Sequence, residues 1–144
     1  MIDVQKGYVE KYDAGLVERI NRRVSEAIEH QELIIYVKNI KKLRHGMKIN
    51  ELAENLHICS SCIVCKEAAS AFSNDELHNI LKQNQVTEME IIGIDGNSCI
   101  ASTATDAQGH GYKVVLPGEY IGVQNSERFE KRKISLAGKG ITII

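Results

Sequence analysis

Three residue types that can perform covalent hydrolysis stand at the ends of apolar segments far apart in the sequence. Asp3 ends a short apolar stub, Lys66 directly follows the run Ile63 to Cys65, and Cys99 stands just beyond the run Ile91 to Ile94. Parallel α/β sheets gather their functional groups at the carboxyl ends of the strands. If these runs are parallel strands, a carboxylate, an ammonium and a thiol meet above one edge of the sheet.

The chemistry that such a group supports is acyl transfer. A thiol, with a free pKa of about 8.5, becomes a strong nucleophile when a helix N-terminus or a nearby ammonium favours its thiolate. Asp3 could take the thiol proton and return it to a leaving amine. Backbone N–H groups between Asp95 and Cys99 could bind a developing oxyanion.

The elements that must position these residues follow from hydrophobic patterning. The chain has 144 residues, about one average domain, and we expect a single domain over residues 1–144. Short β-branched runs alternate with helical stretches, which indicates an α/β fold around a mostly parallel sheet of about six strands. The six strand candidates are Met1 to Val4, Leu33 to Val37, Cys62 to Cys65, Met89 to Ile94, Tyr112 to Leu116 and Ile141 to Ile144.

Helices are expected between these strands. One has an apolar stripe with a residue at every fourth position, a second begins with a capping box, and a third begins in the turn that precedes Cys99. A short helix is also expected within the mixed segment from Asn39 to Ile58. The defining residues are Leu16, Ile20, Val24 and Ile28 for the first helix, Ser73 and Glu76 through Asn84 for the second, Asn97 or Ser98 through Ala107 for the third, and Glu51 to Leu56 for the short one.

Composition excludes several classes of function. Eighteen basic and nineteen acidic residues leave a net charge of −1, which provides no broad field for nucleic acid or anionic lipid. The apolar runs are too short to span a bilayer, and no export signal is recognisable at the N-terminus. We therefore expect a cytoplasmic protein with reduced cysteines, acting on a small molecule, with neither nucleic acid nor membrane as partner.

Three local strings, in the right order, resemble the isochorismatase-like cysteine hydrolases, a family that includes nicotinamidases and carbamoyl-amide hydrolases. They are Ile2-Asp3-Val4-Gln5-Lys6-Gly7-Tyr8-Val9, then Val64-Cys65-Lys66-Glu67-Ala68-Ala69-Ser70-Ala71-Phe72, then Ile92-Gly93-Ile94-Asp95-Gly96-Asn97-Ser98-Cys99-Ile100 with its following helix. The last string is the most specific. The resemblance covers most of the chain and implies a three-layer α/β/α fold.

The resemblance also implies residue roles. Asp3 corresponds to the general base, Lys66 to the lysine of the triad and Cys99 to the nucleophile. It implies a cis peptide between Ile94 and Asp95, which aligns the N–H groups of Asp95 and Cys99 on the oxyanion. Tyr8 and Phe72 would line the substrate pocket. By analogy with the family we expect a homo-oligomer.

Departures from the family pattern leave other functions open. Only two residues precede Asp3, where the family has a full apolar strand. The metal motif of nicotinamidases is not recognisable between Gln31 and Ile58, where His45 and His57 stand alone, which disfavours a nicotinamidase. We expect neither metal nor cofactor. Besides hydrolysis of a small amide, carbamoyl or related carbonyl compound through a thioester, two alternatives remain. One is hydrolysis of a vinyl ether without a covalent cysteine, and the other is a catalytically silent binding or assembly module.

The remaining cysteines form the string Cys59-x2-Cys62-x2-Cys65, which invites a zinc or cluster interpretation. Residues three apart point to opposite faces of a strand. Core or surface thiols are therefore the preferred interpretation of these three residues.

Overall fold

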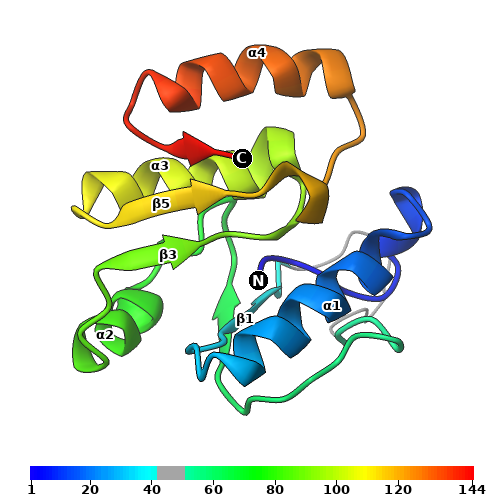
Figure 1. Cartoon of the computed structure of the whole chain (residues 1–144), viewed down its shortest axis with the longest axis horizontal. Coiled ribbons are helices and arrows are strands. Elements are labelled where there is room, and N and C mark those ends of the chain that lie inside the picture. Colours follow the sequence, from blue (N-terminus) through cyan, green and yellow to red (C-terminus); the bar gives the residue numbers. More distant parts are fainter. Residues whose placement is uncertain (42–50) are drawn as a thin grey trace.

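The computed structural model describes residues 1–41 and 51–144. Its order of elements alternates strands and helices (Figure 1). The helices are α1 (Leu16–Glu29), α2 (Asp75–Gln83), α3 (Ala101–Gly109) and α4 (Ser126–Ala137), with short turns η1 (Val9–Lys11), η2 (Gly96–Ile100) and η3 (Gly118–Tyr120). The strands are β1 (Tyr36–Asn39), β2 (Ile63–Lys66), β3 (Glu88–Glu90), β4 (Gly93–Ile94), β5 (Lys113–Leu116), β6 (Ile121–Gly122) and β7 (Thr142–Ile143).

All strand pairs are parallel, as the sequence predicts. β1 pairs with β2, β3 with β5, β5 with β7, and β4 with β6. The N-terminal segment Met1 to Val4, called the stub below, connects the β1–β2 pair to the β4–β6 pair. Ile2 forms parallel bridges to both Val37 and Gly93. Across the sheet the order is therefore β2, β1, the stub, β3 with β4, β5 with β6, and β7.

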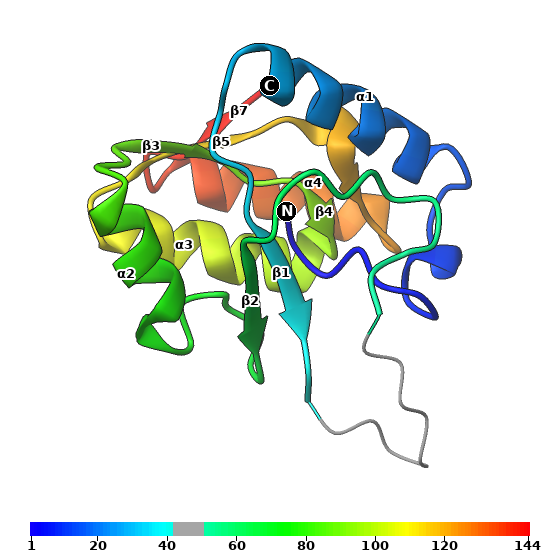
Figure 2. The same cartoon turned by 90° about the horizontal axis from the view of Figure 1, so that it is seen from below.

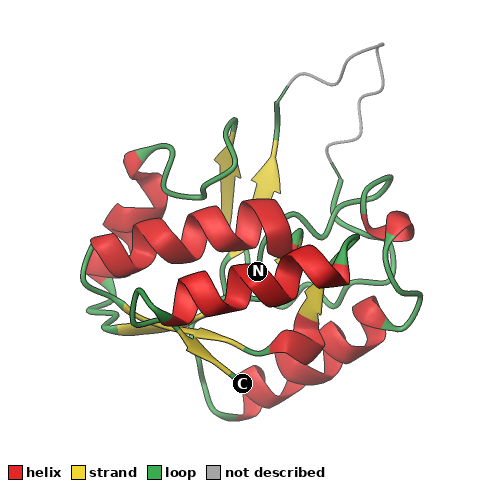
Figure 3. Ribbon diagram, turned by 90° about the horizontal axis from the view of Figure 1, so that it is seen from above, coloured by secondary structure: helices red, strands yellow, loops and turns green. Residues whose placement is uncertain are grey.

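Helices cover the two faces of this sheet (Figures 1 and 2). One apolar cluster joins Leu16, Ile20 and Val24 of α1 to Tyr36 and Ile92 of the sheet. A second cluster joins α2, α3 and α4 to the opposite face, and Figure 3 shows α3 and α4 side by side over the strands. The result is the three-layer α/β/α arrangement that the resemblance implies.

Several predicted boundaries need correction. Ile28 does not belong to the buried stripe of α1, because it is 43% exposed and Ala27 is buried instead. The N-cap of α2 is Asn74, whose side chain accepts from the Glu76 N–H, and not Ser73. The expected short helix at Glu51 to Leu56 is absent, although part of the surrounding segment, residues 42–50, lies outside the described residues.

Part of the C-terminal half was not predicted. α4 was missed because only Phe129 and Leu136 of its residues are buried, which leaves little apolar periodicity to detect. β6 has only two residues, too few to form a pattern. No helix in the two described ranges is long and apolar enough to cross a membrane.

Candidate active site

Asp3 stands where the stub ends and the chain turns away from the sheet. Its N–H donates to Val37 O at 2.9 Å, and its φ of 55° lies in the left-handed region, which aspartate tolerates better than most residues. The fully buried Gln5 then binds the end of β1 through both amide atoms. Its Nε2 donates to Asn39 O at 3.2 Å, and its Oε1 accepts from the Asn39 N–H at 2.7 Å. The carboxyl of Asp3 is thereby fixed at the edge of the sheet.

Lys66, the last residue of β2, is fully buried beside Asp3. Its Nζ lies 2.8 Å from Asp3 Oδ2 and donates to Ala68 O at 3.0 Å and Ala69 O at 2.8 Å. An ammonium has three N–H groups, so these partners match its full donor set. The loop after β2 thus wraps around the charge and holds it in place.

Thr103 of α3 anchors the loop that follows β2. Its side chain is buried, and its Oγ1 accepts from the Ala71 N–H at 3.0 Å. This contact connects the lysine loop to the helix that follows Cys99. Sequence reasoning missed Thr103 and Gln5, because a polar residue inside an element gives no signal of its partner.

Cys99 lies in η2, a turn with an unusually wide hydrogen-bond pattern. The Ile100 N–H donates to Asp95 O at 3.0 Å, one residue further back than in an α-helix, and the Asp95 side chain accepts from the Asn97 N–H at 2.6 Å. The predicted third helix is therefore divided: η2 occupies its first turn, and the α-helix begins only at Ala101. The Ile94–Asp95 peptide bond that leads into this turn is cis.

The turn fits against its neighbours only because Gly96 has no side chain. A Cβ there would lie 2.5 Å from Val123 Cγ1 and 2.8 Å from Phe129 Cε2. Both distances are shorter than any ordinary carbon contact. Gly96 therefore lets η2, the turn that contains Cys99, pack directly on the loop after β6 and on α4.

Burial has the largest influence on the pKa values of Asp3 and Cys99. It raises the pKa of the Asp3 carboxyl, against the lowering effect of the Lys66 charge and hydrogen bond. It also raises the pKa of the Cys99 thiol, with Asp3 adding to the rise and Lys66 opposing it. Burial thus outweighs the opposing effect of Lys66 on the pKa of Cys99, and the raised pKa favours the protonated thiol over the thiolate.

The Cys99 thiol lies close enough to Asp3 and Lys66 for both groups to influence its pKa. Oδ2 of Asp3 pairs with Lys66, whereas its buried Oδ1 has no hydrogen-bond partner within residues 1–41 and 51–144. The structure therefore brings together Asp3, Lys66 and Cys99, with one carboxylate oxygen left to accept a proton.

Tyr12 is a further residue of this site that the sequence did not indicate. Its hydroxyl donates to Asp95 Oδ2 at 3.2 Å, and the Gln124 N–H donates to the same oxygen at 3.3 Å. Burial raises the pKa of Tyr12, and the nearby charges of Asp95, Cys99 and Asp3 add to the rise. Asp95 thus links η2 to the segments that contain Tyr12 and Gln124.

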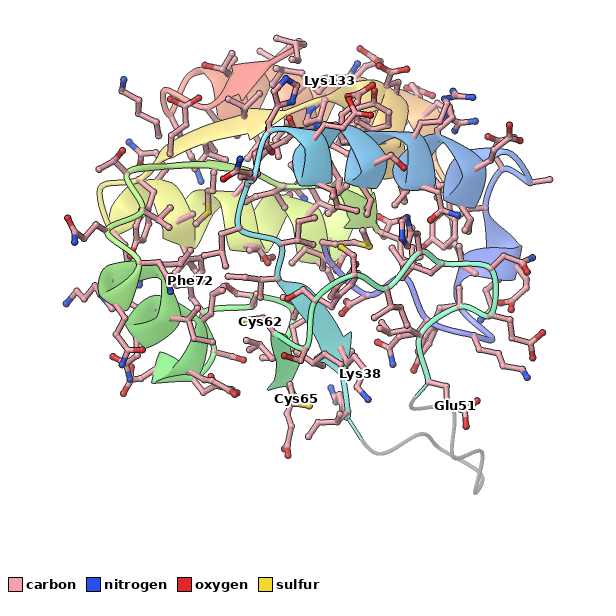
Figure 4. All side chains as sticks on the ribbon, turned by 60° about the horizontal axis from the view of Figure 1, so that its bottom comes forward. Lys38, Glu51, Cys62, Cys65, Phe72 and Lys133 are labelled. Atoms are coloured by element: carbon pink, nitrogen blue, oxygen red, sulfur yellow. The ribbon has the colours of Figure 1, made fainter. Side chains whose placement is uncertain are left out.

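The two aromatic residues predicted to line the substrate pocket, Tyr8 and Phe72, contact residues other than Asp3, Lys66 and Cys99. Phe72 packs edge-on against His78 and at a tilt against His110 and Tyr112, at ring-centroid distances of 6.3, 5.0 and 6.1 Å, and Figure 4 shows it beside α2. Tyr8 is half-buried, with Lys11 Nζ 5.9 Å from its ring centroid. In the described ranges neither residue forms a hydrogen bond, ion pair or ring contact with Asp3, Lys66 or Cys99. A role in substrate binding stays a prediction for both.

The cysteine string does not form a cluster. Cys59 is exposed and its Sγ lies 3.3 Å from the Tyr36 hydroxyl. Cys62 directly precedes β2 and Cys65 lies within it (Figure 4). Within the described ranges, no group of three or more histidine, cysteine, aspartate or glutamate residues could hold a metal ion. His45 lies outside the described residues.

Comparison with known proteins identifies the family. The family model "Isochorismatase domain" matches residues 1–140. The chain belongs to the isochorismatase family. Isochorismatase-family proteins are hydrolases, amidohydrolases among them.

Solved isochorismatase-like structures share the fold over nearly the whole chain. An isochorismatase family protein from Desulfovibrio vulgaris has a TM-score of 0.89 at 20% identity, with 99% of this chain and 90% of that chain covered. The pyrazinamidase of Pyrococcus horikoshii, solved with zinc, has a TM-score of 0.85 at 22% identity and covers 100% and 96%. At these identities the likeness shows the fold.

Curated isochorismatase-family relatives match over shorter segments. An uncharacterized isochorismatase family protein of Bacillus subtilis is 37% identical over 62 residues, which are 43% of this chain and 34% of the relative. The maleamate amidohydrolase of Pseudomonas putida is 27% identical over 77 residues, 54% of this chain and 36% of the relative. The matched segments therefore span about a third of the length of these relatives.

Proposed function

We propose that this isochorismatase-family protein is a cysteine hydrolase of a small amide, carbamoyl or related carbonyl compound. The observation on which the proposal rests is the convergence of Asp3, Lys66 and Cys99 from three separate strand ends in a buried site. A nucleophile, a base within proton-transfer range and a third group that orients the base are the elements of covalent acyl transfer. The amidohydrolases among the relatives support an amide as substrate.

The first half-reaction forms a thioester. Cys99 Sγ attacks the carbonyl carbon while its proton passes to Asp3, and the carbonyl oxygen becomes an oxyanion. The N–H groups of Asp95 and Cys99 stabilise that charge. The tetrahedral adduct then collapses: the C–N bond breaks, and the leaving amine takes the proton from Asp3.

The second half-reaction hydrolyses the thioester. Asp3, again a carboxylate, takes a proton from a water molecule as the water oxygen attacks the thioester carbonyl. The C–S bond breaks, Cys99 recovers the proton, and the carboxylic acid leaves. Lys66 keeps its charge throughout, and it stabilises the carboxylate each time Asp3 is ionised.

Ammonia release from a panel of small amides tests this function. The panel contains nicotinamide, pyrazinamide, maleamate and N-carbamoylsarcosine, and the variants are Cys99→Ala and, as a matched thiol control, Cys62→Ala. We expect at least one amide to be hydrolysed by wild type and by Cys62→Ala, and the rate to fall by about 10³-fold or more in Cys99→Ala. Mass spectrometry should detect the acyl group on the peptide that contains Cys99.

Two outcomes would reject the proposal. Undiminished amide hydrolysis by Cys99→Ala would reject a covalent cysteine and leave Asp3 to act without it. No hydrolysis of any amide, together with Cys99 alkylation that is unaffected by Asp3→Asn, would favour a silent binding module.

A further inference from the structure

A cavity of about 430 Å³ lies between α3, α4 and the loop that follows β2. Residues 68–70 line it from the loop, Ser102, Thr105 and Asp106 line it from α3, and Arg132 lines it from α4. Figure 3 shows the two helices side by side. Among the described residues that line this cavity, only Asp106 and Arg132 carry a charge. Its volume falls within the range of small-molecule sites, which is about 300–1,000 Å³.

Arg132 occupies the face of α4 that packs against the rest of the protein. The buried residues of this helix, Phe129 and Leu136, lie three positions before it and four positions after it, which is the spacing of one helix face. Arg132 is half-buried on that face, yet it forms no hydrogen bond or ion pair within residues 1–41 and 51–144. Its neighbours Lys131 and Lys133 each form an ion pair within α4. Because an anion stabilises a partly desolvated guanidinium, Arg132 favours a ligand with an anionic group at this point.

Asp106 gives the same cavity a negative charge. It lies on α3, one turn after Ser102, and in the described part of the chain its carboxylate forms no hydrogen bond or ion pair. Asp106 and Arg132 therefore line one cavity without pairing with each other. A simple anion bound to Arg132 would be repelled by Asp106, and a simple cation bound to Asp106 would be repelled by Arg132. A molecule that carries both charges pairs with both residues, so the arrangement favours a zwitterion.

Asn97 of η2 adds an unpartnered acceptor to this lining. The residue is only 9% exposed, and its Nδ2 donates to Asn125 O at 3.0 Å. Its Oδ1 has no hydrogen-bond partner in either described range. A buried acceptor without a donor is unfavourable, and the N–H groups of an ammonium supply such a donor. The amide of Asn97 therefore favours a cationic group on the ligand, as Asp106 does.

The cavity lies beside the reactive residues but does not include them. Ala68 and Ala69, which line it, also accept hydrogen bonds from Lys66 through their carbonyl oxygens. Asn97 stands two residues before Cys99, and Cys99 itself does not line the cavity. A ligand there contacts the segments that hold the lysine and the cysteine without reaching the thiol. It is therefore a different molecule from the amide of the proposed hydrolysis.

We propose that this cavity, which we name the zwitterion pocket, binds a small free amino acid. The α-carboxylate pairs with Arg132, and the α-ammonium pairs with Asp106 and donates to Asn97 Oδ1. The hydroxyl groups of Ser102 and Thr105 favour a small polar side chain over an apolar one.

Isothermal titration of the 144-residue protein with L-serine tests the zwitterion pocket. Two matched probes each lack one charge: L-glycerate has a hydroxyl in place of the ammonium, and serinol has a hydroxymethyl group in place of the carboxylate. We expect L-serine to bind with a Kd of about 1 mM or lower, and each of the matched probes to bind at least about tenfold more weakly.

Variants locate the binding. Arg132→Gln and Asp106→Asn should each weaken the binding of L-serine by about tenfold. Arg128→Gln is the matched control, because Arg128 lies on the same helix and does not line the cavity, and it should leave binding unchanged. Circular dichroism checks that each variant is folded.

Several results would overturn this assignment. Equal binding of L-glycerate would show a simple anion site, and equal binding of serinol would show a simple cation site. Unchanged binding by folded Arg132→Gln would place the amino acid elsewhere on the protein. Absence of binding of L-serine, L-threonine and L-asparagine at about 10 mM would reject the pocket. Because the readout is binding without turnover, its failure is distinguishable from failure of the proposed hydrolysis.

Discussion

Replacing Lys66 by methionine tests whether the buried charge pair controls the site. The change removes the ammonium that lies 2.8 Å from Asp3 Oδ2 and keeps an apolar side chain of similar length. Asp3 is only 5% exposed, so without Lys66 its carboxylate has no counter-charge and burial drives the pKa of the carboxyl still higher. We expect Asp3 to be protonated in the folded variant at pH 7.

The magnitude follows from linkage between protonation and folding. The unfolded carboxyl has a pKa of about 3.9, so protonating it at pH 7 spans about 3 pH units and costs about 4 kcal/mol. A group whose folded pKa is raised contributes stability below its unfolded pKa and loses it as pH rises toward the folded pKa. The free energy of unfolding of Lys66→Met should therefore fall by about 1.4 kcal/mol per pH unit between pH 5 and pH 7, relative to wild type.

Urea unfolding followed by circular dichroism at pH 5, 6 and 7 measures this slope. The double variant Lys66→Met with Asp3→Asn should lose it, because no titrating carboxyl remains. Lys6→Met, which removes an exposed ion pair with Glu54, is the control and should change stability little at any pH. A stability loss in Lys66→Met that is independent of pH, or that Asp3→Asn does not alter, would refute the reasoning.

Three further predictions concern the nucleophile turn. Gly96→Ala should cost about 1–3 kcal/mol in urea unfolding because its Cβ meets Val123, whereas Gly109→Ala, with open space around it, should not destabilise. Tyr12→Phe removes a donor to Asp95 and should cost about 1 kcal/mol by the same assay; an unchanged midpoint would contradict that bond. Iodoacetamide should alkylate Cys99 only at higher pH than a free thiol, because its pKa is raised, and Asp3→Asn should lower that pH; an unshifted profile would count against coupling.

Much of the fold was predictable because parallel strands have a simple pattern. The runs around Ile63, Ile91 and Val114 are apolar and β-branched, and each lies in the sheet close to its predicted place. Predicted helix boundaries were wrong where two neighbouring residues satisfy the same local rule. Both Ser73 and Asn74 are good N-caps, and only the actual path of the chain selects Asn74.

The site was predictable only in part. The positions of Asp3, Lys66 and Cys99 could be anticipated because strand ends converge in this kind of sheet. The protonated state of the thiol could not, since it depends on how completely the pocket excludes water, and sequence spacing does not encode burial. Tyr12 was missed for a similar reason: its contact with Asp95 joins loops that are far apart in the chain.

The bridges made by Ile2 have a consequence for the order of assembly during synthesis. Ile2 precedes its partners Val37 and Gly93 by 35 and 91 residues along the chain, so it is synthesised well before either of them. The stub therefore has to wait unpaired until both halves of the sheet exist, and only its docking places Asp3 beside Lys66. The group formed by Asp3, Lys66 and Cys99 is thus completed by a late event, after most of the backbone has folded.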